Sequence, residues 1–146
     1  MTAAAFKLTP EVIPEQDIHE ACADALERLL ICPPAFWFCY PAGAVQLSPA
    51  QAARNSRMGL KRGLPDLWFL YRGVRCIELK RVGGSLSTTR IVRTKRGSPR
   101  VLVGQEEVFP LLVRSGGVQD IAIAHSVEEM LAALERWQIP LRSHHR

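Results

Sequence analysis

The chain has 146 residues, of which 47% are hydrophobic and 23% are charged, and its formal net charge is +5. This composition is typical of one globular domain and excludes a disordered or fibrous chain. No apolar run approaches the roughly 20 residues that a membrane span needs, and the first residues lack the arrangement of a signal peptide. We therefore expect a cytoplasmic protein with a single domain over residues 1–146, a core from about 15 to 137 and a basic arm from about 81 to 100.

The basic residues are concentrated in the middle of the chain. From Arg54 to Arg100 there are thirteen Lys or Arg residues but only two acidic residues, Asp66 and Glu78. The net charge of this stretch is +11, whereas the remainder of the chain carries −6. A solvated surface would mix the signs. A basic field around two acids instead favours a site that attracts phosphates while its carboxylates hold cations.

The first predicted element is a helix that Pro14 opens and that continues to about Leu30. Its apolar residues share one face: Ile18, Ala21, Cys22, Ala25, Leu26, Leu29 and Leu30. Glu15 shares this inward face, where an acid either complements the helix dipole or belongs to a site. Residues 36–40 are aromatic apart from Cys39 and predict a short buried strand.

A second helical segment is predicted from Ser48-Pro49 to Met58, with Gly59 closing it. We expect this segment to bring basic side chains next to the candidate site, namely Arg54, Arg57, Lys61 and Arg62. The four cysteines, Cys22, Cys32, Cys39 and Cys76, have no paired spacing, so we expect buried free thiols.

Residues 66–80 predict a β-hairpin, because two apolar runs flank Arg72-Gly73. A two-residue turn would place Asp66 and Glu78 on different faces of the hairpin. A three-residue loop, Tyr71-Arg72-Gly73 with Gly73 at positive φ, would set Asp66 directly opposite Glu78. In that register two carboxylates and the ammonium of Lys80 converge on one face.

Two facing carboxylates repel each other unless a cation neutralises them, and a divalent ion bound by both is a common solution. Lys80 would then lie beside the attacking water, which is an arrangement for phosphate hydrolysis. The alternative is structural: Asp66 caps the strand start, and Glu78 and Lys80 form a solvated strand face.

Beyond Lys80, the basic stretch to Arg100 has no acid and predicts a mobile or hairpin-like arm that orders on nucleic acid. A helix should start near Gln105 and end at Gly116-Gly117, with a kink or short preceding turn at Pro110. Residues 118–124 predict a buried parallel strand, and Ser126 caps a last helix that Pro140 stops. The predicted fold is α/β, with a mixed sheet flanked by helices.

Pro65-Asp66 followed by Glu78-Leu79-Lys80 resembles the PD-(D/E)xK signature of restriction-endonuclease-like nucleases. The longer run from Gly59 to Lys80 resembles the VRR-NUC family in particular, and the segment 15–19 resembles the first-helix motif of that family. His19 departs from it, because the family usually has Gln there. Leu86-Ser87 and Gln105 match further family elements, although the basic stretch between them is longer than expected for the family.

The resemblance implies a restriction-endonuclease-like core with the order α-β-(α)-β-β-α-β-α. It also implies an Mg²⁺- or Mn²⁺-dependent DNA endonuclease, with Asp66, Glu78 and Glu15 at the metal and Lys80 and Gln105 completing the catalytic set. Stand-alone members resemble Holliday-junction resolvases, which favours branched DNA. Two symmetric cuts need two sites, so we expect a homodimer.

Nucleic acid would be bound by the basic side chains of the second helix, the following loop and the arm. These are Arg54, Arg57, Lys61, Arg62, Arg81, Arg90, Arg93, Lys95, Arg96 and Arg100. Two alternatives stay open: a non-catalytic nucleic-acid-binding module on the same fold, and a restriction-type endonuclease with base-specific cutting.

Overall fold

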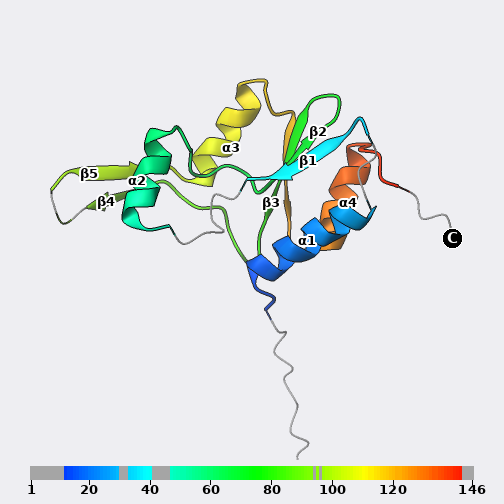
Figure 1. Cartoon of the computed structure of the whole chain (residues 1–146), viewed down its shortest axis with the longest axis horizontal. Helices are drawn as coiled ribbons and strands as arrows, with labels where there is room; N and C mark the ends of the chain where they lie inside the picture. Colours follow the sequence, from blue (N-terminus) through cyan, green and yellow to red (C-terminus); the bar gives the residue numbers. More distant parts are fainter. Residues whose placement is uncertain (1–11, 30–32, 41–46, 94, 96, 143–146) are drawn as a thin grey trace, which may run out of the picture.

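The structure of the chain is a computed structural model that describes residues 12–29, 33–40, 47–93, 95 and 97–142. Its elements are, in chain order, α1 (Glu15–Leu29), β1 (Phe36–Cys39), α2 (Pro49–Arg57), β2 (Leu67–Leu70), β3 (Val74–Leu79), β4 (Arg90–Arg93), β5 (Pro99–Leu102), α3 (Gln105–Arg114), β6 (Asp120–Ala124) and α4 (Val127–Arg136). The predicted α/β class and the predicted order of elements are confirmed, and the arm is a hairpin (Figure 1).

The main sheet has four strands in the order β1-β2-β3-β6. The pairs β1-β2 and β2-β3 are antiparallel, whereas β3 and β6 are parallel, so the sheet is mixed as predicted. A parallel pair needs a long crossover between its strands. Here the crossover from β3 to β6 contains the β4–β5 hairpin and α3.

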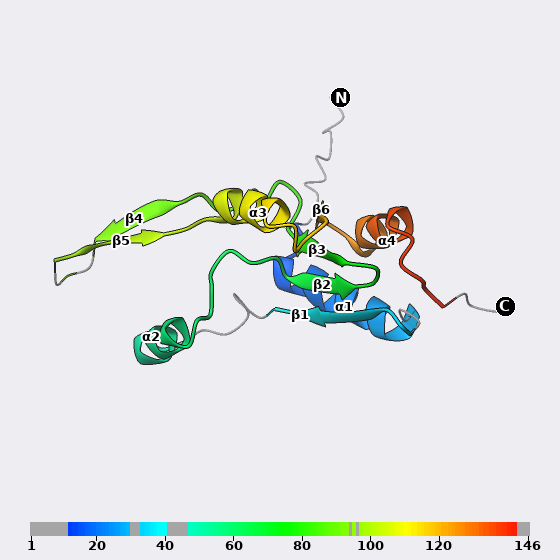
Figure 2. The same cartoon turned by 90° about the horizontal axis from the view of Figure 1, so that it is seen from above.

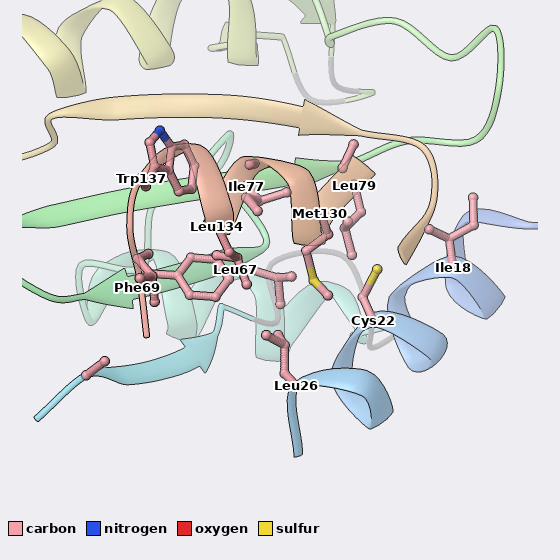
Figure 3. Close-up of a cluster of buried hydrophobic side chains, with 14 residues drawn as sticks. Ile18, Cys22, Leu26, Leu67, Phe69, Ile77, Leu79, Met130, Leu134 and Trp137 are labelled. Atoms are coloured by element: carbon pink, nitrogen blue, oxygen red, sulfur yellow. The ribbon is translucent and has the colours of Figure 1, made fainter. Parts of the chain in front are cut away.

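The hydrophobic core lies between one face of this sheet and two helices, α1 and α4 (Figure 3). Alternate residues of the central strands point into it, because strand side chains alternate between faces. The core side chains come from α1 (Ile18, Cys22 and Leu26), β2 (Leu67 and Phe69), β3 (Ile77 and Leu79) and α4 (Met130 and Leu134). The amphipathic period predicted for α1 is confirmed at Ile18, Cys22 and Leu26, whereas Ala21, which was predicted on the same face, is exposed.

The β2–β3 hairpin has the three-residue loop. The register pairs Leu67 with Ile77 and Leu70 with Val74, so Tyr71, Arg72 and Gly73 form the turn. Gly73 has a φ of 122°, and a Cβ atom built there would lie 2.4 Å from the side chain of Gln119. The turn therefore favours glycine for its backbone conformation, whereas the exposed Gln119 side chain could move aside. One step beyond the Leu67 pair, the same register sets Asp66 opposite Glu78, as predicted.

Two strands are less buried than predicted. Phe36 in β1 is 61% exposed, and Ile123 in β6 is also exposed. Both strands are edges of the sheet, so each has a neighbour on one side only. Trp37 turns toward the core, whereas Phe36 and Phe38 lie on the opposite sheet face, where Phe38 stacks on Trp68. Cys39, on the same edge strand, is exposed rather than buried, and Cys32 lies outside the described residues.

Two elements extend beyond the sheet at the same end of the molecule, α2 and the β4–β5 hairpin (Figure 2). A capping box between Ser48 and Gln51 starts α2, as the Ser48-Pro49 pair predicted. None of the residues of α2 is buried. Caps and propensity rather than core packing therefore hold this helix.

The last two helices flank β6. α3 runs through Pro110 as one helix and buries Phe109, and Gly116 follows it with a φ of 75°. α4 starts at the Ser126 cap, whose hydroxyl accepts a hydrogen bond from the backbone N–H of Glu129. In the described part of the chain, no helix has the length and apolar character needed to cross a lipid bilayer.

Candidate functional site

An open cavity of about 680 Å³ lies where β2 begins and β3 ends. The residues that line it come from α1, the loop before β2, the end of β3, the segment before β4, the base of the β4–β5 hairpin and the start of α3. They are Glu15, Arg62, Gly63, Leu64, Asp66, Glu78, Lys80, Ser85, Leu86, Ser87, Thr88, Arg90, Leu102, Val103, Gly104 and Gln105. All five residues of the predicted catalytic set are therefore in one cavity.

Glu78 is the centre of the polar contacts in this cavity. Its side chain is almost fully buried, with 1% of the residue exposed. Its Oε1 accepts hydrogen bonds from Lys80 Nζ at 2.6 Å and from Gln105 Nε2 at 2.5 Å. Gln105 reaches it from the first turn of α3, 27 residues along the chain. One carboxylate oxygen thus accepts hydrogen bonds from both an ammonium group and an amide group.

The other oxygen of the same carboxylate, Oε2, has no hydrogen-bond partner among the described residues although it is buried. An unpaired buried polar atom costs free energy, and more so when the group is charged. Native structures satisfy nearly all such atoms, so each exception calls for a physical reason. A ligand that completes the coordination of Glu78 would supply one.

Asp66 faces Glu78 from the neighbouring strand. Its Oδ2 accepts a hydrogen bond from the backbone N–H of Leu79 at 2.8 Å, and its carbonyl accepts one from Tyr40 N–H. The strand-start contact expected under the structural alternative is therefore present. The same contact directs the carboxylate of Asp66 toward the end of β3, beside Glu78.

The two ionisable groups at the end of β3 have shifted pKa values. Burial, followed by the charge of Asp66, raises the pKa of Glu78 to about 7, although Lys80 and Gln105 oppose the shift. Burial lowers the pKa of Lys80, but the hydrogen bond and charge of Glu78, with the charges of Glu15 and Asp66, outweigh burial and raise it. Lys80 is therefore a cation at neutral pH, and Glu78 gives up its proton less readily than an ordinary carboxyl group.

Gln105 connects the cavity to the base of the β4–β5 hairpin. Its Oε1 accepts a hydrogen bond from Ser87 N–H at 3.2 Å, and its own backbone N–H donates to Ser87 Oγ at 3.0 Å. Because β4 and β5 pair with each other, the ends of the long basic stretch come together. The greater length between Ser87 and Gln105 therefore does not separate them.

Thr89 and Gly104 close the hairpin base, and our sequence analysis did not identify either residue. The hydroxyl of Thr89 donates to Glu107 Oε2 at 2.7 Å and accepts from Gly104 N–H at 3.0 Å. A Cβ atom at Gly104 would lie 2.3 Å from the carbonyl oxygen of Ser87. The only sequence signal was a glycine directly before the predicted helix start.

Glu15 lies at the edge of the cavity rather than at its centre. Its Oε1 is 3.8 Å from Lys80 Nζ, and its side chain is 48% exposed. In the described part of the chain, no three His, Cys, Asp or Glu side chains are grouped closely enough to surround one metal ion. The three predicted metal ligands thus divide into a facing pair, Asp66 and Glu78, and a separate acid that faces Lys80.

Two of the ten predicted nucleic-acid-binding residues line the cavity, Arg62 and Arg90. The described residues among the others lie outside its lining, on α2, in the loops or on the hairpin: Arg54, Arg57, Lys61, Arg81, Arg93, Lys95 and Arg100. Arg96 lies outside the described residues. A second hollow, of about 560 Å³ at the Tyr71-Arg72-Gly73 turn, contains none of the predicted site residues.

No protein-family model matches the chain, and neither a curated protein nor a solved structure is significantly similar to it. The function must therefore be inferred from the chemistry of the cavity.

Proposed function

We propose that the chain is a metal-dependent DNA endonuclease that hydrolyses phosphodiester bonds. One observation carries the proposal: a buried carboxylate, Glu78, has an oxygen without a partner among the described residues, in a cavity that also contains Asp66 and Lys80. A purely structural buried ion pair is stabilising only when its remaining polar atoms are satisfied. Glu78 does not meet that condition unless a ligand binds it.

The donor atoms suit Mg²⁺ or Mn²⁺. Carboxylate oxygens are the hard donors that these ions prefer, and Mg²⁺ often uses only one or two carboxylates together with waters and substrate phosphates. Asp66 and Glu78 would hold the ion, with Glu15 supporting the site from its edge. When bound, such an ion neutralises charge on the phosphoryl group and acidifies water. Two protein carboxylates are sufficient for this kind of site.

The other residues of the cavity would hold the reactants in place. Lys80 has an ammonium with three donors, one of which is used by Glu78 at 2.6 Å. The remaining donors can hold a water and a phosphate oxygen next to the carboxylates. Gln105 is a positioning residue, because its amide fixes the orientation of Glu78 through Oε1. Arg62 and Arg90 would attract the phosphate backbone.

The resemblance to the VRR-NUC family supports this proposal, because the residues that carry it lie in one cavity. They are Glu15, Asp66, Glu78, Lys80 and Gln105. The order of helices and strands also agrees with the restriction-endonuclease-like core that the resemblance implies. On the same basis we propose branched DNA, with a four-way junction favoured, as the substrate and a homodimer as the active assembly.

A cleavage assay tests the function. Purified protein is incubated with end-labelled linear, flap and four-way DNAs in Mg²⁺, Mn²⁺ or EDTA. We expect cleavage in Mg²⁺ or Mn²⁺ and none in EDTA, with the branched substrates cut fastest. Titration calorimetry without DNA provides a second readout: Mn²⁺ should bind the wild-type chain and bind Asp66→Asn far more weakly. Absence of both cleavage and metal binding would refute the proposal.

A second candidate is a nucleic-acid-binding module without catalytic activity. It is favoured by the absence, among the described residues, of a group of three acids around one ion. It predicts DNA binding that is the same in Mn²⁺ and in EDTA, without cleavage. The nuclease proposal predicts cleavage that depends on the metal, so the same assay separates the two.

A further inference from the structure

The β4–β5 hairpin is a two-stranded ribbon whose two faces differ in their relation to the cavity. Arg90 pairs with Leu102, and both of these residues line the cavity. Because strand side chains alternate, the next pair on the same face is Val92 and Arg100. We call these four residues the inner face. The outer face contains Ile91, Arg93, Pro99 and Val101.

The inner face extends the wall of the cavity with positive charge. Arg62 and Arg90 lie at the cavity, and Arg100 follows one pair farther along the ribbon. Among the described residues, no ion pair involves Arg90, Arg93 or Arg100. The segment 81–104 contains six Lys or Arg residues and no acid. A polyanion is therefore the partner that matches the charge of this surface.

In the described part of the chain, the apolar side chains of the ribbon are hardly covered by any other element. Its eight strand residues are exposed apart from the half-buried Leu102, and the outer-face pair Ile91 and Val101 is 68% and 57% exposed. An isolated two-stranded hairpin is only marginally stable in water. The base is nevertheless held against α3 by Thr89 and Ser87, and the ribbon extends beyond the main sheet (Figure 2).

We propose that the inner face of this ribbon binds the duplex DNA that flanks the scissile phosphate. This inference rests on the proposed nuclease function. It specifies that the substrate is double-stranded on one side of the cut. The DNA major groove, about 12 Å wide, admits a two-stranded β-ribbon. Four strand residues span about 13 Å, which corresponds to about four base pairs at 3.4 Å each.

A single strand fits this surface less well. Proteins that bind single strands combine a basic groove with aromatic side chains on which bases stack. The segment 81–104 contains no Phe, Tyr or Trp. Its cations and β-branched residues can contact phosphates and groove walls but offer no stacking platform. Duplex is therefore the expected ligand of the ribbon.

Two variants on opposite faces provide the test. Arg100→Gln removes one charge from the inner face, and Arg93→Gln removes one from the outer face. Both residues are exposed and lie in adjacent cross-strand pairs, Val92–Arg100 and Arg93–Pro99, so the two variants match in charge and nearly in place along the ribbon. Far-UV circular dichroism and thermal melting check that both fold like the wild-type protein.

Binding is measured by fluorescence anisotropy in EDTA, with a labelled 24-base-pair duplex and its single strand over a range of salt concentrations. For the duplex, Arg100→Gln should weaken binding about tenfold at 0.1 M salt and lower the slope of log affinity against log salt by about 0.9. Arg93 is one of the ten residues that the sequence predicted to bind nucleic acid, but it lies on the outer face. We therefore remove it from that set, and Arg93→Gln should change the affinity less than twofold. The wild-type protein should prefer the duplex to the single strand.

Equal losses in the two variants, or single-strand binding as tight as duplex binding, would overturn the inference. Because the measurement is made in EDTA, it does not depend on cleavage. If the protein cuts DNA but the two variants lose the same affinity for the duplex, only the assignment of the ribbon is wrong. If the two variants differ in duplex affinity but the protein neither cuts DNA nor binds metal, the proposed nuclease function is wrong instead.

Discussion

The local environment of Glu78 opposes its ionisation and at the same time suits a bound cation. Burial and the charge of Asp66 raise its pKa to about 7, and Lys80 compensates only in part. Groups held in such environments are more frequent at functional sites than elsewhere. The folded protein therefore carries, at neutral pH, a carboxylate that would be more stable in water. This cost to stability can be measured.

Stability should depend on pH because of Glu78. Its pKa is about 7 in the folded chain against an ordinary value of 4.5, so the folded state binds more protons between these two values. The free energy of unfolding should therefore fall as pH rises from about 4.5 to 7, by on the order of 3 kcal/mol from this group. Urea unfolding of the wild-type protein and Glu78→Gln in EDTA measures the difference between them at each pH. If this difference is the same at pH 5 and pH 8, the raised pKa of Glu78 in the folded chain is wrong.

Lys80 should matter for turnover more than for metal binding. Lys80→Met keeps much of the length of the side chain but removes the ammonium that would hold the attacking water. We expect the cleavage rate to fall by about 10²- to 10⁴-fold, while calorimetry still detects Mn²⁺. Arg114→Met is the control, because Arg114 is exposed, does not line the cavity and is not among the residues expected to bind nucleic acid. A Lys80 variant with normal turnover would exclude this role.

At the scale of elements, the base of the hairpin links the ribbon to the cavity. Gly104 hydrogen-bonds to Thr89, and its neighbour Gln105 hydrogen-bonds to Ser87. The side chain of Gln105 in turn hydrogen-bonds to Glu78. Any change that separates the ends of the hairpin should therefore also displace the amide that positions Glu78. The coupling runs through hydrogen bonds from the segment before β4 to the first turn of α3 and from there to β3.

Gly104→Ala should disturb both the hairpin base and the cavity. The added Cβ atom would lie 2.3 Å from the Ser87 carbonyl oxygen, so the backbone must shift. Such overpacking costs typically about 1–3 kcal/mol, and cleavage should fall because Gln105 moves with its neighbour. Gly117→Ala is the control, since its new Cβ would meet nothing closer than Ser115 Oγ at 3.4 Å. The melting temperature and the cleavage rate should both fall in Gly104→Ala and stay unchanged in Gly117→Ala.

At the scale of the whole molecule, one chain contributes one cavity of this composition. Resolving a four-way junction requires two symmetric cuts in opposing strands, and a two-fold dimer presents two identical sites for them. Trp37 on β1 and Trp137 at the end of α4 are largely internal. Trp37 packs against the core, and Trp137 is buried and donates a hydrogen bond to Asp120. The exposed Phe36 and Phe38 on edge strand β1 are the better candidates for a contact between copies.

The proposed dimer can be tested by its mass and by its cleavage pattern. Light scattering on the purified protein should give about twice the 16.3 kDa mass of the monomer, and paired nicks should appear on a four-way junction. Phe36→Ser should shift the mass toward the monomer and uncouple the two nicks. A stable wild-type monomer that cuts flaps or duplex and ignores junctions would leave the nuclease chemistry standing and remove the resolvase assignment.

Features that depend on near neighbours in the chain were predictable from the amino-acid pattern. The caps at Ser48 and Ser126 start their helices as expected, since a cap is a contact over three residues. The register of the β2–β3 hairpin followed from the choice of a three-residue loop, which placed Asp66 opposite Glu78. The helical period likewise identified the buried face of α1.

Features that depend on the order of strands and on distant contacts required the tertiary structure. Apolar strands do not reveal whether they lie at the centre or the edge of a sheet, so the exposure of Phe36 and Ile123 was not predictable. The closure of the basic arm at Thr89 and Gly104 and the unpartnered oxygen of Glu78 were not predictable either. Each depends on groups that approach one another only after folding, and no local periodicity or propensity encodes such contacts.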